Sequence, residues 1–171
     1  MLSLDGEMVS LGYYNNQPDP TGTWGSLTEY QPPETQSLSP DGDTVTTTWY
    51  VQGLRIEQTV TLPSPDAQFY RLDWNITNRD ASPVENIHFL RGEDTYLAGG
   101  DDGNGFWNSN TSTVGVKKTV GGVQQRLSYQ GITEPSGYRS ASYYAVIQDV
   151  ESGSLANSVI PDRHDNGYAL A

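Results

Sequence analysis

The stretch VTTTWYVQGLRIEQTVTL, residues 45–62, decides the fold class of this chain. On both sides of Gly53, apolar side chains alternate with polar ones at a period of two residues. This period is typical of strands with one buried face, so the stretch predicts two strands, 45–51 and 54–62, joined in a hairpin. Pro63 and Pro65 follow directly and end the second strand, because proline cannot donate to a strand ladder.

The same period continues outward from this hairpin. Residues 70–77 repeat it clearly, and shorter apolar stretches predict further strands at 8–14, 84–90, 113–118, 124–130 and 142–150. No segment shows a sustained helical period with capping residues. The sequence therefore predicts an all-β chain, in which residues 1–171 form a single antiparallel β-sandwich with long loops rich in Gly and Asp. The predicted core consists of Trp49, Ile56, Val60, Leu72, Trp74, Ile76 and Phe89.

The composition limits the classes of partner. The 171 residues include 21 acidic and 9 basic side chains and no cysteine, for a net charge of −12. Such a surface repels nucleic acid and anionic membranes, so we expect neither as a partner. No apolar run is long enough to predict insertion into a membrane. The acidity suits a protein that lives with divalent cations, although negative charge also serves solubility alone.

The stretch RGEDTYLAGGDDGNGFW, residues 91–107, predicts a cation-binding loop. Carboxylates and an amide crowd together on a glycine-rich backbone, and calcium prefers several such oxygen ligands at one point. The EF-hand spacing is absent. We therefore predict Ca²⁺ at this loop, with a solvated acidic hairpin loop as the alternative. The candidate ligands here are Glu93, Asp94, Asp101, Asp102 and Asn104, and a second cluster near the C-terminus, which is otherwise a polar turn, adds Asp162 and Asp165.

Aromatic residues in the same stretch are candidates for ligand contacts. Tyr96 lies within it, and Phe106 and Trp107 end it, so a ligand at the ion would meet apolar rings there; the alternative is that these rings seal the loop onto the fold. Gly99 and Gly100 complete the predicted ligand-binding set. The aromatic and proline-rich residues Trp24, Tyr30, Pro32 and Pro33 form either another ligand platform or the cover of a core edge.

Catalytic signatures are weak in this sequence. His88 and His164 are the two histidines, and neither lies near a recognisable nucleophile motif or in zinc-binding spacing. Carboxylates are so numerous that a glycosidase pair remains compatible with the sequence. We therefore expect a protein that is not an enzyme.

The sequence from Phe69 to Asn78, FYRLDWNITN, followed by Arg91-Gly92-Glu93-Asp94, resembles extracellular bacterial β-sandwich modules. The nearest group comprises the ligand-binding modules of large RTX-type adhesins, and residues 45–91 also resemble galactose-mutarotase-like sandwiches. The first resemblance implies a calcium-dependent module at the bacterial cell surface, in which the ion meets a peptide or a glycan carried by another cell. Met1–Asp5 lacks the basic and apolar regions of a signal peptide, so we expect a monomeric module of a longer extracellular protein.

Three functions remain open at this point. The first is a calcium-dependent adhesion module that recognises a peptide or a glycan at the ion-bearing loop. The second is a carbohydrate-active enzyme, or its accessory carbohydrate-binding sandwich, which the aromatics, the carboxylates and the mutarotase-like strands favour. The third is a structural spacer without a ligand.

Overall fold

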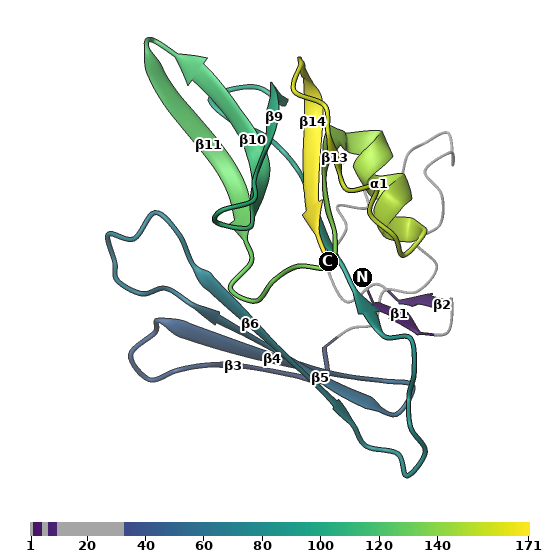
Figure 1. The fold of residues 1–171 in the computed structure, drawn as a ribbon. Helices are drawn as coiled ribbons and strands as arrows, with labels where there is room; N and C mark the ends of the chain where they lie inside the picture. Colours follow the sequence, from purple (N-terminus) through teal and green to yellow (C-terminus); the bar gives the residue numbers. More distant parts are fainter. Residues whose placement is uncertain (1, 5–6, 10–32) are drawn as a thin grey trace, which may run out of the picture. The chain divides into compact units, whose positions relative to one another are not determined.

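A computed structural model describes residues 2–4, 7–9 and 33–171, and it confirms the all-β class, with antiparallel-rich sheets and one short helix in that part of the chain (Figure 1). The chain divides into two compact units. One comprises Val9–Glu85, and the other comprises Met1–Met8 together with Asn86–Ala171. The prediction of a single module over residues 1–171 stays a prediction. Among the described residues, no helix is long and apolar enough to cross a membrane.

The first unit contains a four-stranded antiparallel sheet in the order β3-β4-β5-β6 (Figure 1). Its strands are β3 (Thr35–Leu38), β4 (Thr44–Val51), β5 (Leu54–Thr61) and β6 (Arg71–Asn78). The register from Thr44 opposite Thr61 to Val51 opposite Leu54 is unbroken. The predicted strands 45–51, 54–62 and 70–77 therefore agree with β4, β5 and β6 to within one residue at each end.

The apolar face of this sheet carries most of the predicted core. Trp49 and Ile56 lie opposite each other and are buried, at 5% and 0% exposure. Trp74 stacks on Trp49 with ring centroids 5.9 Å apart. The remaining predicted core residues are half-buried rather than buried: Val60, Leu72, Trp74, Ile76 and, in the other unit, Phe89.

The second unit is built on a seven-stranded sheet in the order β11-β10-β9-β14-β12-β13, with β8 also paired to β14. Its strands are β8 (Arg91–Asp94), β9 (Asp102–Asn108), β10 (Thr113–Val120), β11 (Val123–Gln130), β12 (Tyr138–Ser142), β13 (Ser158–Val159) and β14 (Arg163–Leu170). One buried cluster comprises Leu90, Ala141, Val146, Val150, Leu155 and Ala169. Another comprises Val114, Val116 and Tyr168.

A small sheet in the order β2-β1-β7 includes the N-terminal strands β1 (Leu2–Leu4) and β2 (Glu7–Val9). Its third strand, β7 (His88–Phe89), contains the only two residues of the predicted strand 84–90 that form a strand. Of the predicted strand 8–14, residues 8–9 belong to β2, and residues 10–14 lie outside the described residues. Trp24, Tyr30 and Pro32 of the proposed aromatic platform also lie outside them.

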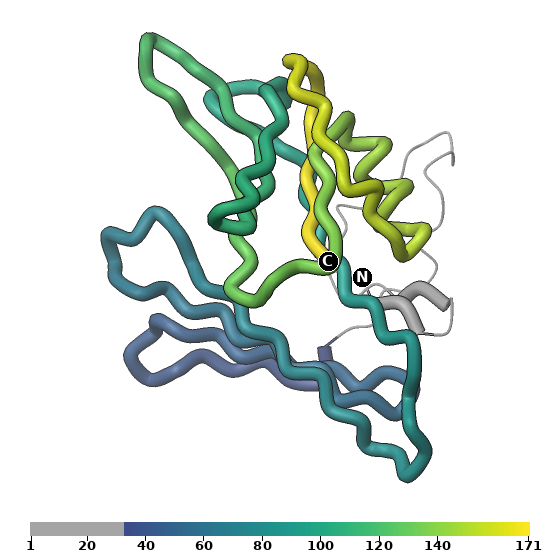
Figure 2. The backbone as a smooth tube through the Cα atoms, in the orientation of Figure 1, coloured from purple at the N-terminus to yellow at the C-terminus, as the bar shows by residue number. Residues whose placement is uncertain are grey.

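The predicted strand 142–150 is wrong, because this segment forms the helix α1 (Tyr143–Glu151), visible as the coil before the C-terminal strands (Figure 2). The Ser142 side chain caps the helix by accepting a hydrogen bond from the Ala145 amide. Val146 and Val150, one helical turn apart, are the buried residues of α1. The apolar run 143–147 fits both periods, and packing of these two valines against Leu90 and Ala169 selects the helix.

The prediction that residues 91–107 form a loop is wrong, because most of these residues belong to β8 and β9. Its turn is confined to the connection between them, where Ala98 and Gly99 have positive φ angles of 53° and 79°. Gly103 and Gly105 instead allow close packing within a strand. A Cβ atom at Gly103 would lie 2.3 Å from Val116 Cγ1, and one at Gly105 would lie 2.6 Å from the Ile160 carbonyl.

Candidate functional site

The strand β14 joins the two predicted groups of metal ligands. Asp165 on β14 lies opposite Asp102 on β9, and Gly167 lies opposite Asp94 on β8. Asp101 directly precedes β9, and its carbonyl accepts a hydrogen bond from the Asn166 amide at 3.1 Å. The acidic residues of 93–102 and of 162–165 are therefore neighbours in space, although the sequence suggests two separate clusters.

Some of the predicted ligands are already engaged within the fold. Asp102 pairs with Lys118 at 2.5 Å and with Arg163, and these hydrogen bonds lower its pKa to about 2. Glu93 pairs with Arg91 at 3.2 Å and accepts a hydrogen bond from the Tyr168 hydroxyl at 2.9 Å.

Two further predicted ligands, Asn104 on β9 and Asp162 in the connection that leads to β14, make contacts that involve backbone carbonyls. The amide group of Asn104 donates to the Pro161 carbonyl at 2.8 Å. Asp162 directly follows, and its carbonyl lies 2.6 Å from Nδ1 of His164. The contacts of Asp102 and Glu93 engage carboxylate oxygens that a cation would otherwise use. Those of Asn104 and Asp162 involve an amide nitrogen and a backbone carbonyl instead.

Asp94, Asp101 and Asp165 behave differently, and we call them the carboxylate cluster. Partial burial raises the pKa of Asp94, the charges of Asp165 and Asp101 raise it further, and a hydrogen bond from the Thr95 amide opposes the shift. Burial and the charge of Asp101 likewise raise the pKa of Asp165, against a smaller opposing effect of His164. In the described part of the chain, no ion pair joins any of the three to a basic side chain.

The start of α1 borders the carboxylate cluster with two tyrosines. The Tyr143 and Tyr144 rings lie against each other, with centroids 4.1 Å apart. The pKa of Tyr143 is raised by burial, by a hydrogen bond with Tyr144 and by the charges of Asp165 and Asp94. Sequence reasoning missed both tyrosines, because it assigned them to a strand. The signal that could have found them is Ser142, a good N-cap residue directly before an apolar run.

The cluster does not form a closed metal centre. Among residues 33–171, no group of three or more His, Asp or Glu side chains converges as a ready-made metal site. Asp101 and Asp165 lie close enough to Asp94 to raise its pKa, but a cation would have to draw the oxygens of the three carboxylates together.

The predicted ligand-binding residues separate into different environments. Tyr96, 72% exposed, lies in the connection between β8 and β9. Gly99 forms the turn, and a Cβ on Gly100 would meet the Asp102 carboxylate and the Lys118 amine.

Phe106 and Trp107 are successive residues of β9 and so face opposite sides of its sheet. Lys117 lies over the Phe106 ring, 5.8 Å from its centroid. The Trp107 ring stacks on the Tyr138 ring, with centroids 4.1 Å apart and nearly parallel planes. Tyr96 is therefore the predicted aromatic that remains both exposed and adjacent in sequence to the carboxylate cluster.

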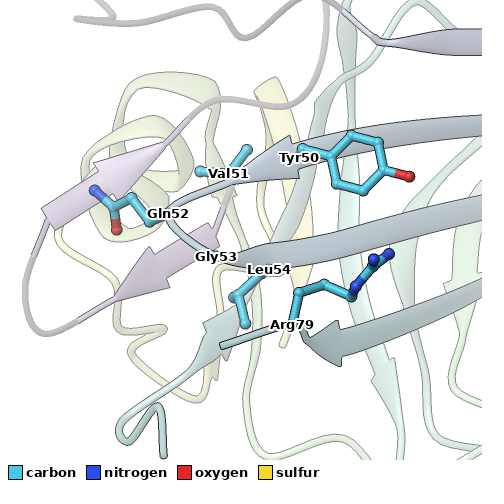
Figure 3. Close-up of a pocket in the computed structure, with 6 residues that line it drawn as sticks. All are labelled: Tyr50, Val51, Gln52, Gly53, Leu54 and Arg79. Atoms are coloured by element: carbon cyan, nitrogen blue, oxygen red, sulfur yellow. The ribbon is translucent and has the colours of Figure 1, made fainter. Parts of the chain in front are cut away.

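A second candidate site is a shallow hollow in the first unit, at the turn between β4 and β5 (Figure 3). It is lined by Tyr50, Val51, Gln52, Gly53, Leu54 and Arg79. The side chains of Tyr50 and Arg79 extend from it in the same direction (Figure 3). Tyr50 is 52% exposed, and within the described residues Arg79 has no ion-pair partner. An exposed ring beside an unpaired guanidinium suits a polar ligand with a flat face.

Comparison of the chain with protein-family models, with curated proteins and with solved structures gave no match.

Proposed function

We propose that this chain is a non-catalytic binding module of a bacterial surface protein, in which the carboxylate cluster holds a calcium ion that meets a peptide or a glycan. The supporting observation is that Asp94, Asp101 and Asp165 come from three segments that β14 brings together. The charges of Asp101 and Asp165 add to the burial that raises the pKa of Asp94, and the charge of Asp101 adds to the burial that raises the pKa of Asp165. Repulsion among like charges costs stability, and a divalent cation would remove that cost.

Calcium suits this cluster better than a smaller cation. It accepts about six to eight oxygens in flexible geometry, whereas magnesium demands a nearly ideal octahedron and gives up its water reluctantly. Three aspartates supply part of such a shell and leave positions for a ligand carboxylate or for paired sugar hydroxyls. The exposed rings of Tyr96 and Tyr144, at 72% and 54% exposure, would then offer contact area to the ligand. The ligand is expected on another cell, and the module is expected to act as a monomer.

Thermal unfolding with calcium and with a chelator tests this function. If the ion binds only the folded chain, a hundredfold excess over the dissociation constant raises stability by about 2.7 kcal/mol. Asp94→Asn and Asp165→Asn should abolish the calcium-dependent rise. Asp73→Asn is the matched control, because Asp73 is paired with Arg71 at 2.7 Å in the other unit and its loss should leave the rise intact. Identical melting curves in calcium and chelator for the metal-free chain would exclude the proposal.

A second candidate function is carbohydrate binding without calcium, and the hollow beside Tyr50 and Arg79 favours it. The ring would stack on a sugar face while the guanidinium donates to hydroxyl or carboxylate oxygens. A glycan array probed in chelator distinguishes the two functions. Binding that survives chelation and is lost in both Tyr50→Ala and Arg79→Ala supports the hollow, whereas binding lost on chelation supports the carboxylate cluster.

A further inference from the structure

The β10–β11 hairpin differs in charge from the rest of the chain. Residues 103–133 contain no Asp or Glu, and they include Lys117, Lys118 and Arg126. The chain as a whole has 21 acidic residues against 9 basic ones. This segment, which contains β10 and β11, is therefore positively charged in a strongly acidic protein.

Two of these cations face each other without a counter-ion. Lys117 lies directly opposite Arg126 in the register of β10 and β11, and like charges in this position destabilise a sheet. Lys118 is paired with Asp102, whereas no described acidic side chain forms an ion pair with Lys117 or Arg126. The Lys117 ammonium group lies over the face of the Phe106 ring, 5.8 Å from its centroid. The pair would be stabilised by a carboxylate from outside the described chain.

Among the described strands, none pairs with the outer edge of β11. β11 ends the order β11-β10-β9-β14-β12-β13, and its eight-residue pairing with β10 contains no bulge. Proteins usually protect such an edge with proline, bulges, charged residues or short strands, and β11, of sequence VQQRLSYQ, has one of these features, the single charge of Arg126. β6 is another eight-residue edge strand in the described part of the chain, but its Arg71 is already paired with Asp73.

The hairpin geometry tells which groups point outward. Gly121 and Gly122, with φ of 58° and 80°, form a two-residue turn, so Val120 and Val123 are the hydrogen-bonded pair that flanks it. Because such pairs alternate along an antiparallel ladder, residues 124, 126, 128 and 130 direct their amide and carbonyl groups away from β10. The side chain of Arg126 stands on one face of this edge, whereas Val123 and Leu127, 62% and 38% exposed, stand on the other.

We propose that β11 is a docking edge that accepts an extended, acidic segment of a partner protein as an added antiparallel strand. Main-chain hydrogen bonds to residues 124–130 would supply the pairing, and a carboxylate on the added strand would lie beside Arg126 and Lys117. Apolar residues at alternate positions of the same segment would cover Val123 and Leu127. A symmetric pairing of β11 with β11 of a second copy is disfavoured, because it would bring two positively charged edges together.

A synthetic peptide of about eight residues, in which glutamate alternates with valine, matches the length and both faces of this edge and serves as the probe. Binding is measured in chelator, so that the result is independent of the proposed calcium site. We expect the peptide to slow hydrogen exchange at the amides of residues 124, 126, 128 and 130. A peptide in which lysine replaces every glutamate should leave these amides unprotected.

Two variants separate backbone pairing from charge. Ser128→Pro removes an outward amide but no bond to β10, and it should weaken binding about tenfold or more, whereas Ser128→Ala should bind as the parent does. Arg126→Glu should weaken binding about fivefold without loss of the fold.

Equal binding by Ser128→Pro and the parent, equal binding of the lysine peptide, or protection confined to other strands would overturn the proposal. Concentration-dependent self-association that Ser128→Pro abolishes would also overturn it, because the occupant would then be a second copy.

Discussion

The hairpins β4–β5 and β10–β11 have nearly the same backbone and different surroundings. Each pairs eight residues without a break around a two-residue turn with positive φ angles, Gln52-Gly53 in one and Gly121-Gly122 in the other. β4–β5 has a neighbouring strand on both sides, whereas β10–β11 has one only on the β10 side within the part of the chain that the structure describes.

Their charges are also arranged differently. On the first sheet, Arg55 pairs with Glu57 and Arg71 with Asp73, each two residues apart on one strand. In the second unit, Lys117 and Arg126 face each other on the hairpin, and Asp94, Asp101 and Asp165 gather elsewhere. Local pairing of charges is sufficient for a structural sheet, whereas separated charges leave each group available to a partner of opposite sign.

The largest expected difference lies in the apolar centres of the two hairpins. Ile56→Ala should lower the free energy of unfolding by about 2–5 kcal/mol, because the Ile56 side chain is fully buried. Leu127→Ala should cost less than about 1 kcal/mol, since Leu127 is 38% exposed. Urea unfolding of both variants measures the difference, and an equal loss would show that β11 is covered rather than open.

The next largest difference is expected between the two hairpin turns, in the stability that a glycine-to-alanine substitution costs. Gly122→Ala should cost about 1–2 kcal/mol, because its φ is +80° and no atom lies within 4 Å of the added Cβ. Gly53→Ala carries the same backbone cost and also brings Cβ to 2.0 Å from an Asp80 carboxylate oxygen, so it should cost more. Denaturant unfolding in an Asp80→Ala background should remove the excess; if the excess persists, the crowding is not its cause.

The carboxylates of the second unit should respond to pH with opposite signs. In chelator at neutral pH, Asp165→Asn should raise the free energy of unfolding by about 0.5 kcal/mol, because it removes a carboxylate whose pKa is raised in the folded state. This advantage should disappear as the pH falls through the folded pKa toward 3.8, since the parent then binds the proton in its folded state.

Asp102→Asn should change stability in the opposite direction from Asp165→Asn. Because the pKa of Asp102 is lowered to about 2, its stabilising effect should be complete above pH 3.8 and should be lost as the pH falls from there to about 2. Stability curves of parent and variants against pH measure both effects. Curves that shift in the same direction for the two variants would contradict the assigned environments.

The smallest expected effect concerns the unpaired cations. Arg126→Glu should raise stability by about 0.2–1 kcal/mol, because it replaces a like-charge pair with Lys117 by an opposite-charge pair. Arg71→Glu should lower stability by a similar small amount, since it removes the pair with Asp73 and adds a repulsion. Thermal unfolding at low salt and at high salt distinguishes these effects from packing, because salt should reduce both.

The sequence by itself determined the strands β4, β5 and β6 and the two-residue hairpin turn at Gly53. In these segments each side chain's preference, its two-residue period and its neighbours along the chain all favour one structure. The sequence also identified Asp94, Asp101 and Asp165 as oxygen donors, but it assigned the first two to a loop and Asp165 to another cluster.

Only the tertiary structure decided that residues 143–151 are a helix and that the segments carrying these three aspartates lie side by side. The run from Tyr143 to Ile147 is apolar under either period, so packing of Val146 against residues distant in sequence selects the helix. The aspartates become neighbours because β14 pairs with both β8 and β9, and these pairings join residues from 59 to 79 positions apart in the sequence. Patterns of neighbouring residues do not encode which distant strands pair, because that choice depends on the burial that the whole sheet achieves.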